Sequence, residues 1–257
     1  MFYFCWMRYA LNVSYLGTNY HGWQKQPNAI SVQEELENVF STIFRRKIIT
    51  MGSGRTDTGV HASEQVLHLD TNEIELNKNS IGKVNRLLPK DISINGFAEM
   101  KEDFHARFDA VKRSYIYKIA TKKSPFNQGQ AYRVNYPLDI DRMNEACQFL
   151  LGKHDFCSFS KVHTEVNNFM CEVLRAEWKE EKDEIHFHVS ANRFLRGMVR
   201  ALVGTLLEIG RGKKEPFWIK DVLSKKDRSA AGRNVPAEGL FLCEVQYEPS
   251  LNWIKVD

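Results

Sequence analysis

The stretch "IITMGSGRTDTGVHASEQVLHLD" (residues 48–70) places a polar, glycine-rich loop between two strand-like segments. A short strand is expected near residues 48–51, and the segment after the loop alternates, with Val66, Leu67 and Leu69 carrying its apolar content. The sequence therefore predicts that residues 52–63 join two strands. Strands connected directly by a loop pair in antiparallel fashion.

Helices and strands are also expected on both sides of this segment. Residues 8–15 ("RYALNVSY") alternate like a strand, and Ser31 with Glu34 forms a capping box that begins a helix. The apolar face of that helix holds Val32, Leu36, Val39, Phe40 and Ile43. A second helix, with Ile81, Val84, Leu87 and Leu88 on one face, is expected to stop at Pro89, before a strand over 92–100.

The second half of the chain repeats this pattern of strands and packed helices. A strand is expected over 113–120, with Tyr115, Tyr117 and Ile119 on one face, and a hairpin is expected to turn near Lys182 and Asp183. Three helices are expected. The first ends at Gly152, and its apolar face holds Met143, Ala146, Cys147, Leu150 and Leu151. The second runs from about Arg196 to Gly210, and the third covers 218–223. A buried strand over 239–247 is expected last.

These elements predict an α+β fold with a mainly antiparallel, mixed sheet flanked by helices. We expect an N-terminal lobe over residues 1–112, which carries the glycine-rich loop, and a C-terminal lobe over 113–257. No Pro-, Gly- or Ser-rich linker separates them, which favours a sheet shared between the lobes.

Composition narrows the class of protein. The 257 residues are 43% apolar with a formal net charge of +4, which fits a globular protein and permits a polyanionic partner. Cations gather in clusters that are interleaved with aromatic residues, a pattern that favours nucleic acid. The clusters lie at 45–47, 112–113, 122–123, 193–200, 211–214 and 225–228.

The cysteines and the N-terminus indicate a cytoplasmic protein. Five scattered cysteines without a CxxC pair predict neither a disulfide framework nor a zinc knuckle. Arg8 interrupts the apolar start, which we interpret as leading into a strand rather than as a signal peptide. No segment approaches the roughly 18 apolar residues of a membrane span.

The loop contains a single carboxylate, Asp57, and this limits its chemistry. It lacks the GK[ST] ending and the following helix of a phosphate loop, and His61 and His68 lie seven residues apart with no second acid to complete a metal site. Glycoside hydrolysis usually needs a partner carboxylate, which only a distant acid would supply. A lone nucleophile or base, kept ionised by Arg55, remains. A turn-capping aspartate with Arg55 as a surface partner remains as well.

The segment "GRTDTGVHA" (54–62) resembles the GRTDAGVHA signature of the tRNA pseudouridine synthases that modify positions 38 to 40 in the anticodon arm. The resemblance covers nearly the whole chain, with its motifs in the family's order and spacing. They are "YHGWQKQPNAISVQEELE" (20–37), "VNRLLPKDISI" (84–94), "FHARFDAVKRSYIYKI" (104–119), "DFCSFS" (155–160), "ANRFLRGMVRALVGTLLEIG" (191–210) and "AEGLFL" (237–242).

The resemblance implies a fold with two similar lobes around a basic cleft, and isomerisation of uridine to pseudouridine at position 38, 39 or 40 without metal or cofactor. Asp57 is then the essential catalytic residue, acting on a base turned out of the RNA. Arg200 is the cation that pairs with Asp57, Tyr115 stacks on the target base, and Arg55 contacts RNA. The partner is tRNA, and a cytoplasmic homodimer is expected.

The sequence departs from the family pattern at several points. Leu16 and Thr58 replace an aspartate and an alanine that are common in the family, changes that we expect to leave the chemistry intact. The segment "EVNNFMCEVLRAEW" (165–178) lacks the arginine often found in the family before its strand, which puts the RNA contacts of that segment in question. The extra residues before Arg8 leave Met1 and Met7 open as start sites.

Two further functions use the same features. A tRNA-folding helper would use the cationic surface without chemistry, and an N-glycosidase would share the attack on the sugar but release free uracil. The sequence leaves the order of steps at C1′, through a covalent adduct or a glycal, open.

Overall fold

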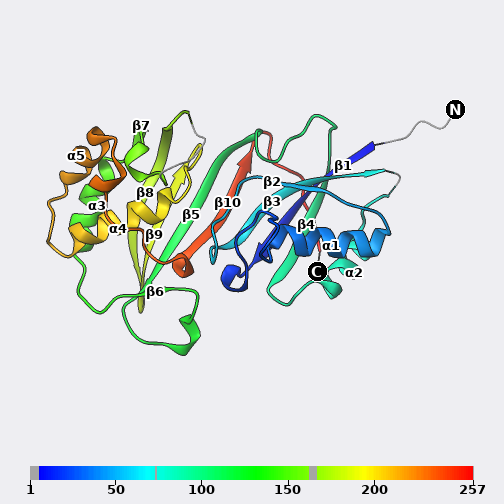
Figure 1. Ribbon diagram of the computed structural model, residues 1–257, viewed down its shortest axis with the longest axis horizontal. Coiled ribbons are helices and arrows are strands. Elements are labelled where there is room, and N and C mark those ends of the chain that lie inside the picture. Colours follow the sequence, from blue (N-terminus) through cyan, green and yellow to red (C-terminus); the bar gives the residue numbers. More distant parts are fainter. Residues whose placement is uncertain (1–5, 73, 162–166, 257) are drawn as a thin grey trace. The chain divides into compact units, whose positions relative to one another are not determined.

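The computed structural model of the protein describes residues 6–72, 74–161 and 167–256 (Figure 1). The chain forms two compact units, a first unit of Met1–Val111 with Leu242–Asp257 and a second unit of Lys112–Phe241. Both contain helices packed with mainly antiparallel strands, which confirms the predicted α+β class. Within the described ranges, no helix has the length and apolar character needed to cross a bilayer.

The strands of the first unit are antiparallel, in the order β11–β4–β1–β3, with β2 added on β3. Their bounds are Trp6–Tyr15 for β1, Thr50–Gly52 for β2, His61–Asn72 for β3, Ile92–Met100 for β4 and Ile254–Lys255 for β11. In β1 and β3, Tyr9 lies opposite Leu69 and Leu11 opposite Leu67, and all four are buried. Because β2 and β3 pair directly, the loop between them is a hairpin connection, as predicted.

Helices α1 (Val32–Phe44) and α2 (Lys78–Leu87) complete the first unit and contact each other. The Ser31 hydroxyl accepts the Glu34 backbone N–H, as expected of the residue that begins α1, and Val32, Leu36 and Phe40 are fully buried. Leu87 is wrongly assigned to the buried face of α2, since it is 54% exposed.

The strands of the second unit follow the order β5–β9–β8–β7, with a parallel partner, β6, on β5. Their bounds are Ala110–Ala120 for β5, Tyr132–Arg133 for β6, Gly152–Asp155 for β7, Met170–Glu181 for β8 and Glu184–Ala191 for β9. The predicted hairpin joins β8 to β9, with Lys182 in the left-handed conformation at the turn. Ile185, Phe187 and Val189 are buried on one face of β9, as expected.

Three helices pack in the second unit: α3 (Ile140–Gln148), α4 (Met198–Gly210) and α5 (Trp218–Lys225). Helix α3 lies against both β8 and α4. Eleven of the thirteen residues of α4 are buried, so this helix is enclosed on nearly every side rather than along one stripe. It is therefore the core element of the second unit.

Two expectations for the second half are wrong. Helix α3 does not run to Gly152; it ends at Gln148, and Phe149 and Leu150 turn back through N–H bonds to Ala146 and Cys147. Gly152, with φ of 88°, instead allows the chain to turn into β7.

The C-terminal segment is the second correction. Residues 242–257 were expected in the lobe that begins at residue 113, but they belong to the first unit. Strand β10 (Leu240–Tyr247) runs through the boundary, β11 pairs with β4, and the Tyr247 hydroxyl donates to the Ala106 carbonyl at 2.6 Å. These backbone and side-chain contacts hold the segment there.

Replacing Gly204 with alanine tests the enclosure of α4. A Cβ atom at this position would lie 1.8 Å from the Arg233 carbonyl oxygen, whereas one at Gly82, inside α2, meets nothing within 4 Å. We expect Gly204→Ala to lower the free energy of unfolding by about 1–3 kcal/mol in urea denaturation. Gly82→Ala should leave it unchanged or raise it by up to about 1 kcal/mol. Equal effects of the two changes would contradict this packing.

Candidate active site

The loop that carries Asp57 is anchored at its start by buried polar groups. The Ser53 N–H donates to the Val66 carbonyl at 2.7 Å, and its hydroxyl donates to Gln65 Oε1 at 2.6 Å. The Gln65 amide in turn donates to the Gly54 carbonyl at 3.0 Å. Ser53 and Gln65 are almost fully buried, so these bonds are shielded from water and the first residues of the loop are fixed on β3.

The middle of the loop is held by the last residue of β1 and by the segment that follows it. The hydroxyls of Thr56 and Tyr15 lie 2.8 Å apart in a buried contact, and the Trp23 N–H donates to the Thr56 carbonyl at 3.2 Å. Gly22, with φ of 93°, lies against the same peptide, where a Cβ would stand 2.5 Å from the Thr56 oxygen. Asp57 therefore follows a residue whose backbone and side chain are both restrained.

The end of the loop turns tightly into β3. The Val60 N–H donates to the Asp57 carbonyl at 3.1 Å, and Gly59, with φ of 77°, donates its N–H to the Tyr20 carbonyl. Thr56 and Val60 are buried, Asp57 is half-buried between them, and Arg55 is exposed. The loop thus presents one carboxylate at the surface on a backbone bonded on both sides.

Two buried histidines on β3 serve as acceptors. His61 Nδ1 accepts the Gly17 N–H at 2.9 Å, and His68 Nδ1 accepts the Ala106 N–H at 3.1 Å. Burial, aided by the nearby charges of Arg8 and His105, lowers the pKa of His68 to about 4. Both histidines thus accept backbone N–H groups, and the described residues contain no group of three or more potential metal-ligating side chains.

Tyr115 and Arg200 belong to the second unit, whereas Asp57 and Arg55 belong to the first. Tyr115 lies on β5 opposite Val189, is half-buried, and makes an edge contact with the Phe194 ring at 5.0 Å between centroids. The face predicted for this strand is confirmed, because Tyr117 and Ile119 are fully buried on it.

Arg200 lies in the first turn of α4 and is oriented by the loop that follows α5. Its Nε donates to the Val235 carbonyl at 2.7 Å, and the Val235 N–H donates to the Arg200 carbonyl at 3.3 Å. These two bonds hold both the backbone of Arg200 and the Nε end of its guanidinium group against Val235. Arg200 is itself half-buried.

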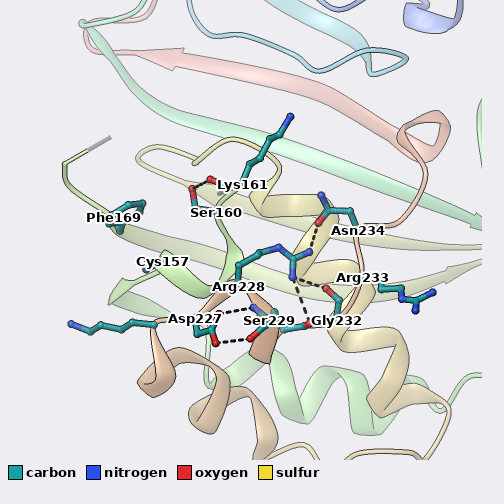
Figure 2. Close-up of a pocket in the computed structure, with 12 residues that line it drawn as sticks. Cys157, Ser160, Lys161, Phe169, Asp227, Arg228, Ser229, Gly232, Arg233 and Asn234 are labelled. Carbon is teal, nitrogen blue, oxygen red and sulfur yellow. Dashed lines mark hydrogen bonds between the residues drawn. The ribbon is translucent and has the colours of Figure 1, made fainter. Parts of the chain in front are cut away.

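Arg228 holds the same loop in shape, a role that sequence reasoning missed. Its guanidinium donates to the Gly232 carbonyl at 3.0 Å and to Asn234 Oδ1 at 2.7 Å, and Figure 2 shows it reaching along the loop to both. Gly232 also lies against Gly204, and its N–H donates to the Thr205 hydroxyl at 2.9 Å. Only a cationic cluster at 225–228 was visible in the sequence, and the cluster did not single out one arginine.

The sequence model of the tRNA pseudouridine synthase family matches residues 12–109 and 146–248 of the chain. A tRNA pseudouridine synthase A of Bacteroides fragilis is 47% identical over 242 residues, which cover 93% of this chain and 96% of the relative. The corresponding protein of Bacteroides thetaiotaomicron is 48% identical, covering 93% and 90%. One of Bacillus pumilus is 41% identical, covering 94% and 100%.

A crystal structure of an archaeal box H/ACA sRNP Nop10–Cbf5 complex aligns with a TM-score of 0.35 at 11% identity, over 86% of this chain and 59% of that one. This likeness is too low to bear on the site. The sequence matches, by contrast, span both units. The chain belongs to the tRNA pseudouridine synthase A family, whose members are isomerases that convert uridine to pseudouridine in tRNA.

Replacing Gly22 with alanine tests how the Asp57 loop is held. The new Cβ would force apart the Gly22 and Thr56 backbones in a conformation that strains any L-residue, so we expect about 1–3 kcal/mol lower stability in urea denaturation. Turnover per folded molecule should fall about 10- to 100-fold, since this change displaces Asp57, which we propose below as the catalytic carboxylate. Gly54→Ala, in the same loop with open space around it, should change neither. A fully active and stable Gly22→Ala protein would contradict the described contact.

Replacing His68 with asparagine tests the buried neutral histidine. The folded protein holds the pKa of His68 near 4, below the reference value of about 6.5, so only the unfolded chain takes up this proton between those values. Stability is therefore lost as the pH falls from about 6.5 to 4. His68→Asn should make that loss shallower, by less than about 1.4 kcal/mol per pH unit. An unchanged slope in His68→Asn would contradict the assignment.

Proposed function

We propose that the protein isomerises uridine to pseudouridine at position 38, 39 or 40 of the tRNA anticodon arm, with Asp57 as the catalytic carboxylate. The observation that carries the proposal is the half-buried carboxylate on a loop bonded to β1, β3 and the segment that follows β1. A fixed backbone favours catalysis by this carboxylate, because a nucleophile that is already held in position loses little conformational entropy on reaching the transition state. The position within the tRNA rests on the family resemblance of "GRTDTGVHA".

The reaction is balanced without any co-reactant. The N1–C1′ bond breaks while the Asp57 carboxylate either attaches to C1′ or takes a ribose proton to leave a glycal. The uracil then turns within the site and C5 bonds to C1′; in the glycal route the ribose takes back its proton at this step. The proton on C5 is lost to solvent, and N1, which carried no proton in uridine, gains one from solvent. The same atoms are present before and after, so neither a metal nor a cofactor is required by the stoichiometry.

Three other side chains receive roles from the resemblance. Arg200, whose Nε is already held by the Val235 carbonyl, supplies the cation that orients the catalytic carboxylate. Tyr115 stacks on the uracil ring; such a platform contributes about 1–3 kcal/mol per base. Arg55, exposed two residues before Asp57, binds the RNA and helps to hold the base in its extruded position.

We further propose that the protein acts in the cytoplasm as a homodimer that binds one tRNA across both subunits. The four cysteines in the described part of the chain are free thiols, which suits a reducing compartment. The dimer rests on the family resemblance. Of the segment 165–178, whose RNA contacts were in question, residues 165 and 166 lie outside the described residues, as does Met1 among the two possible start sites.

Replacing Asp57 with asparagine tests the central assignment. This change keeps the size of the side chain and removes its charge, so tRNA binding should survive while turnover falls by at least about 1000-fold. The measurement is tritium release from tRNA labelled at uridine C5. Thr58→Ala, an exposed neighbour in the same loop, should retain nearly full turnover.

Other outcomes of this experiment identify other functions. Wild-type turnover by Asp57→Asn would show that another residue is the catalytic carboxylate. Free uracil in the product would indicate an N-glycosidase. Equal rescue of misfolded tRNA by both proteins, with no tritium release from either, would indicate a folding helper.

A further inference from the structure

A cavity of about 830 Å³ lies in the second unit (Figure 2). Three segments form its walls: residues 157–161, which contain the short helix η3 (Cys157–Phe159), then Phe169 just before β8, and the loop 226–234 after α5. The Ser158 hydroxyl joins two of these walls, because it donates to the Val222 carbonyl at 2.6 Å and accepts the Asp227 N–H at 3.0 Å. The cavity is therefore built from connected segments of one unit.

The cavity lining carries four cations and one acid. The cations are Lys161, Lys226, Arg228 and Arg233, and the acid is Asp227. Asp227 caps the short helix η4 (Arg228–Ala230), where its carboxylate accepts the N–H and hydroxyl of Ser229. The Asp227 carboxylate is therefore already hydrogen-bonded within its own loop. The lining has an excess of positive charge, which favours an anionic ligand.

The four cations divide into two that are already used and two that are available. Arg228 is committed to the loop acceptors described above, and Lys226 pairs with Asp155 at 3.1 Å. Lys161 and Arg233 are both exposed, and neither forms an ion pair with any acid in the described ranges. Figure 2 shows their side chains extending in different directions, so the two suit separate anionic groups.

The cavity shares its walls with the structure that orients Arg200. Asn234, in the lining, immediately precedes Val235, whose carbonyl accepts from Arg200 Nε. On the opposite wall the Lys161 N–H donates to the Arg196 carbonyl at 2.9 Å, four residues before Arg200. An anion in this cavity would thus lie beside the proposed catalytic arginine.

We propose that this cavity binds the sugar-phosphate backbone of the tRNA near the target uridine, with Lys161 and Arg233 each neutralising one phosphate. The proposal rests on the function proposed above, which supplies a polyanion at Arg200. Arg228 acts as a positioning residue, because it keeps the loop that displays Arg233 and Asn234 in one conformation. Phosphate contacts of this kind fix the register of the RNA without reading its sequence.

The test is the salt dependence of tRNA binding by the double variant Lys161→Ala/Arg233→Ala. Each phosphate contact contributes about 0.7 to 0.9 to the slope of log affinity against log salt, so the slope should become shallower by about 1.4 to 1.8 between 50 and 200 mM salt. KM for tRNA should rise several-fold, while kcat at saturating tRNA should stay within about twofold. Both side chains are exposed, so folding should be unaffected in thermal unfolding.

A matched control is available in Lys123→Ala/Arg133→Ala. Both residues are exposed, and the variant also removes two charges. Arg133, in β6, pairs with Ala120 at the far end of β5, and Lys123 lies just past that end. Ala120 also pairs with Glu184, at the start of β9. Strand β8 runs its whole length of 12 residues between that end and Phe169, a separation of roughly 35 Å. The control should leave the slope within about 0.5 of the wild-type value.

The results separate the cavity from the reaction. An unchanged slope in Lys161→Ala/Arg233→Ala, or equal losses in both double variants, would overturn the cavity proposal even if the wild type forms pseudouridine. If Lys161→Ala/Arg233→Ala shows the expected slope change but the wild type never releases tritium, the proposed function alone would be overturned.

Discussion

The peptide between Thr56 and Asp57 lies directly against Gly22, and this contact determines where the loop carboxylate stands. The Thr56 carbonyl accepts the Trp23 N–H, and any side chain at Gly22 would collide with the carbonyl oxygen. Two backbone segments separated by more than thirty residues are therefore held at a distance that only glycine permits. The position of the Asp57 carboxylate therefore follows from the packing of this backbone.

The second unit uses the same physical device around Arg200. Gly204, inside the enclosed helix α4, lets the Arg233 carbonyl approach to a distance that a methyl group would forbid, and Gly232 lies against the Gly204 carbonyl. The loop then meets Arg200 through paired backbone and side-chain bonds at Val235. Since α4 is buried nearly all round, the arginine is mounted on one of the least mobile elements of the unit.

Some cations near the cavity bind partners within the protein, and others are exposed to solvent, a division that the net charge of +4 does not reveal. Arg228 and Lys226 neutralise or bridge partners within the second unit, whereas Lys161 and Arg233 remain exposed. An RNA ligand is therefore expected to gain affinity from a minority of the cations near the cavity. The others maintain the shape that makes those contacts possible.

By itself, the sequence determined the capped helix after Ser31, the hairpin at Lys182 and the family, because these depend on local periodicity, turn chemistry and the order of motifs. Only the tertiary structure decided the use of Gly152 as a strand entry, the return of residues 242–257 to the first unit, and the contact of Gly22 with the Asp57 loop. Those outcomes depend on which distant backbones come within a few ångströms of one another. That distance cannot be predicted from the residues next to a given position in the chain.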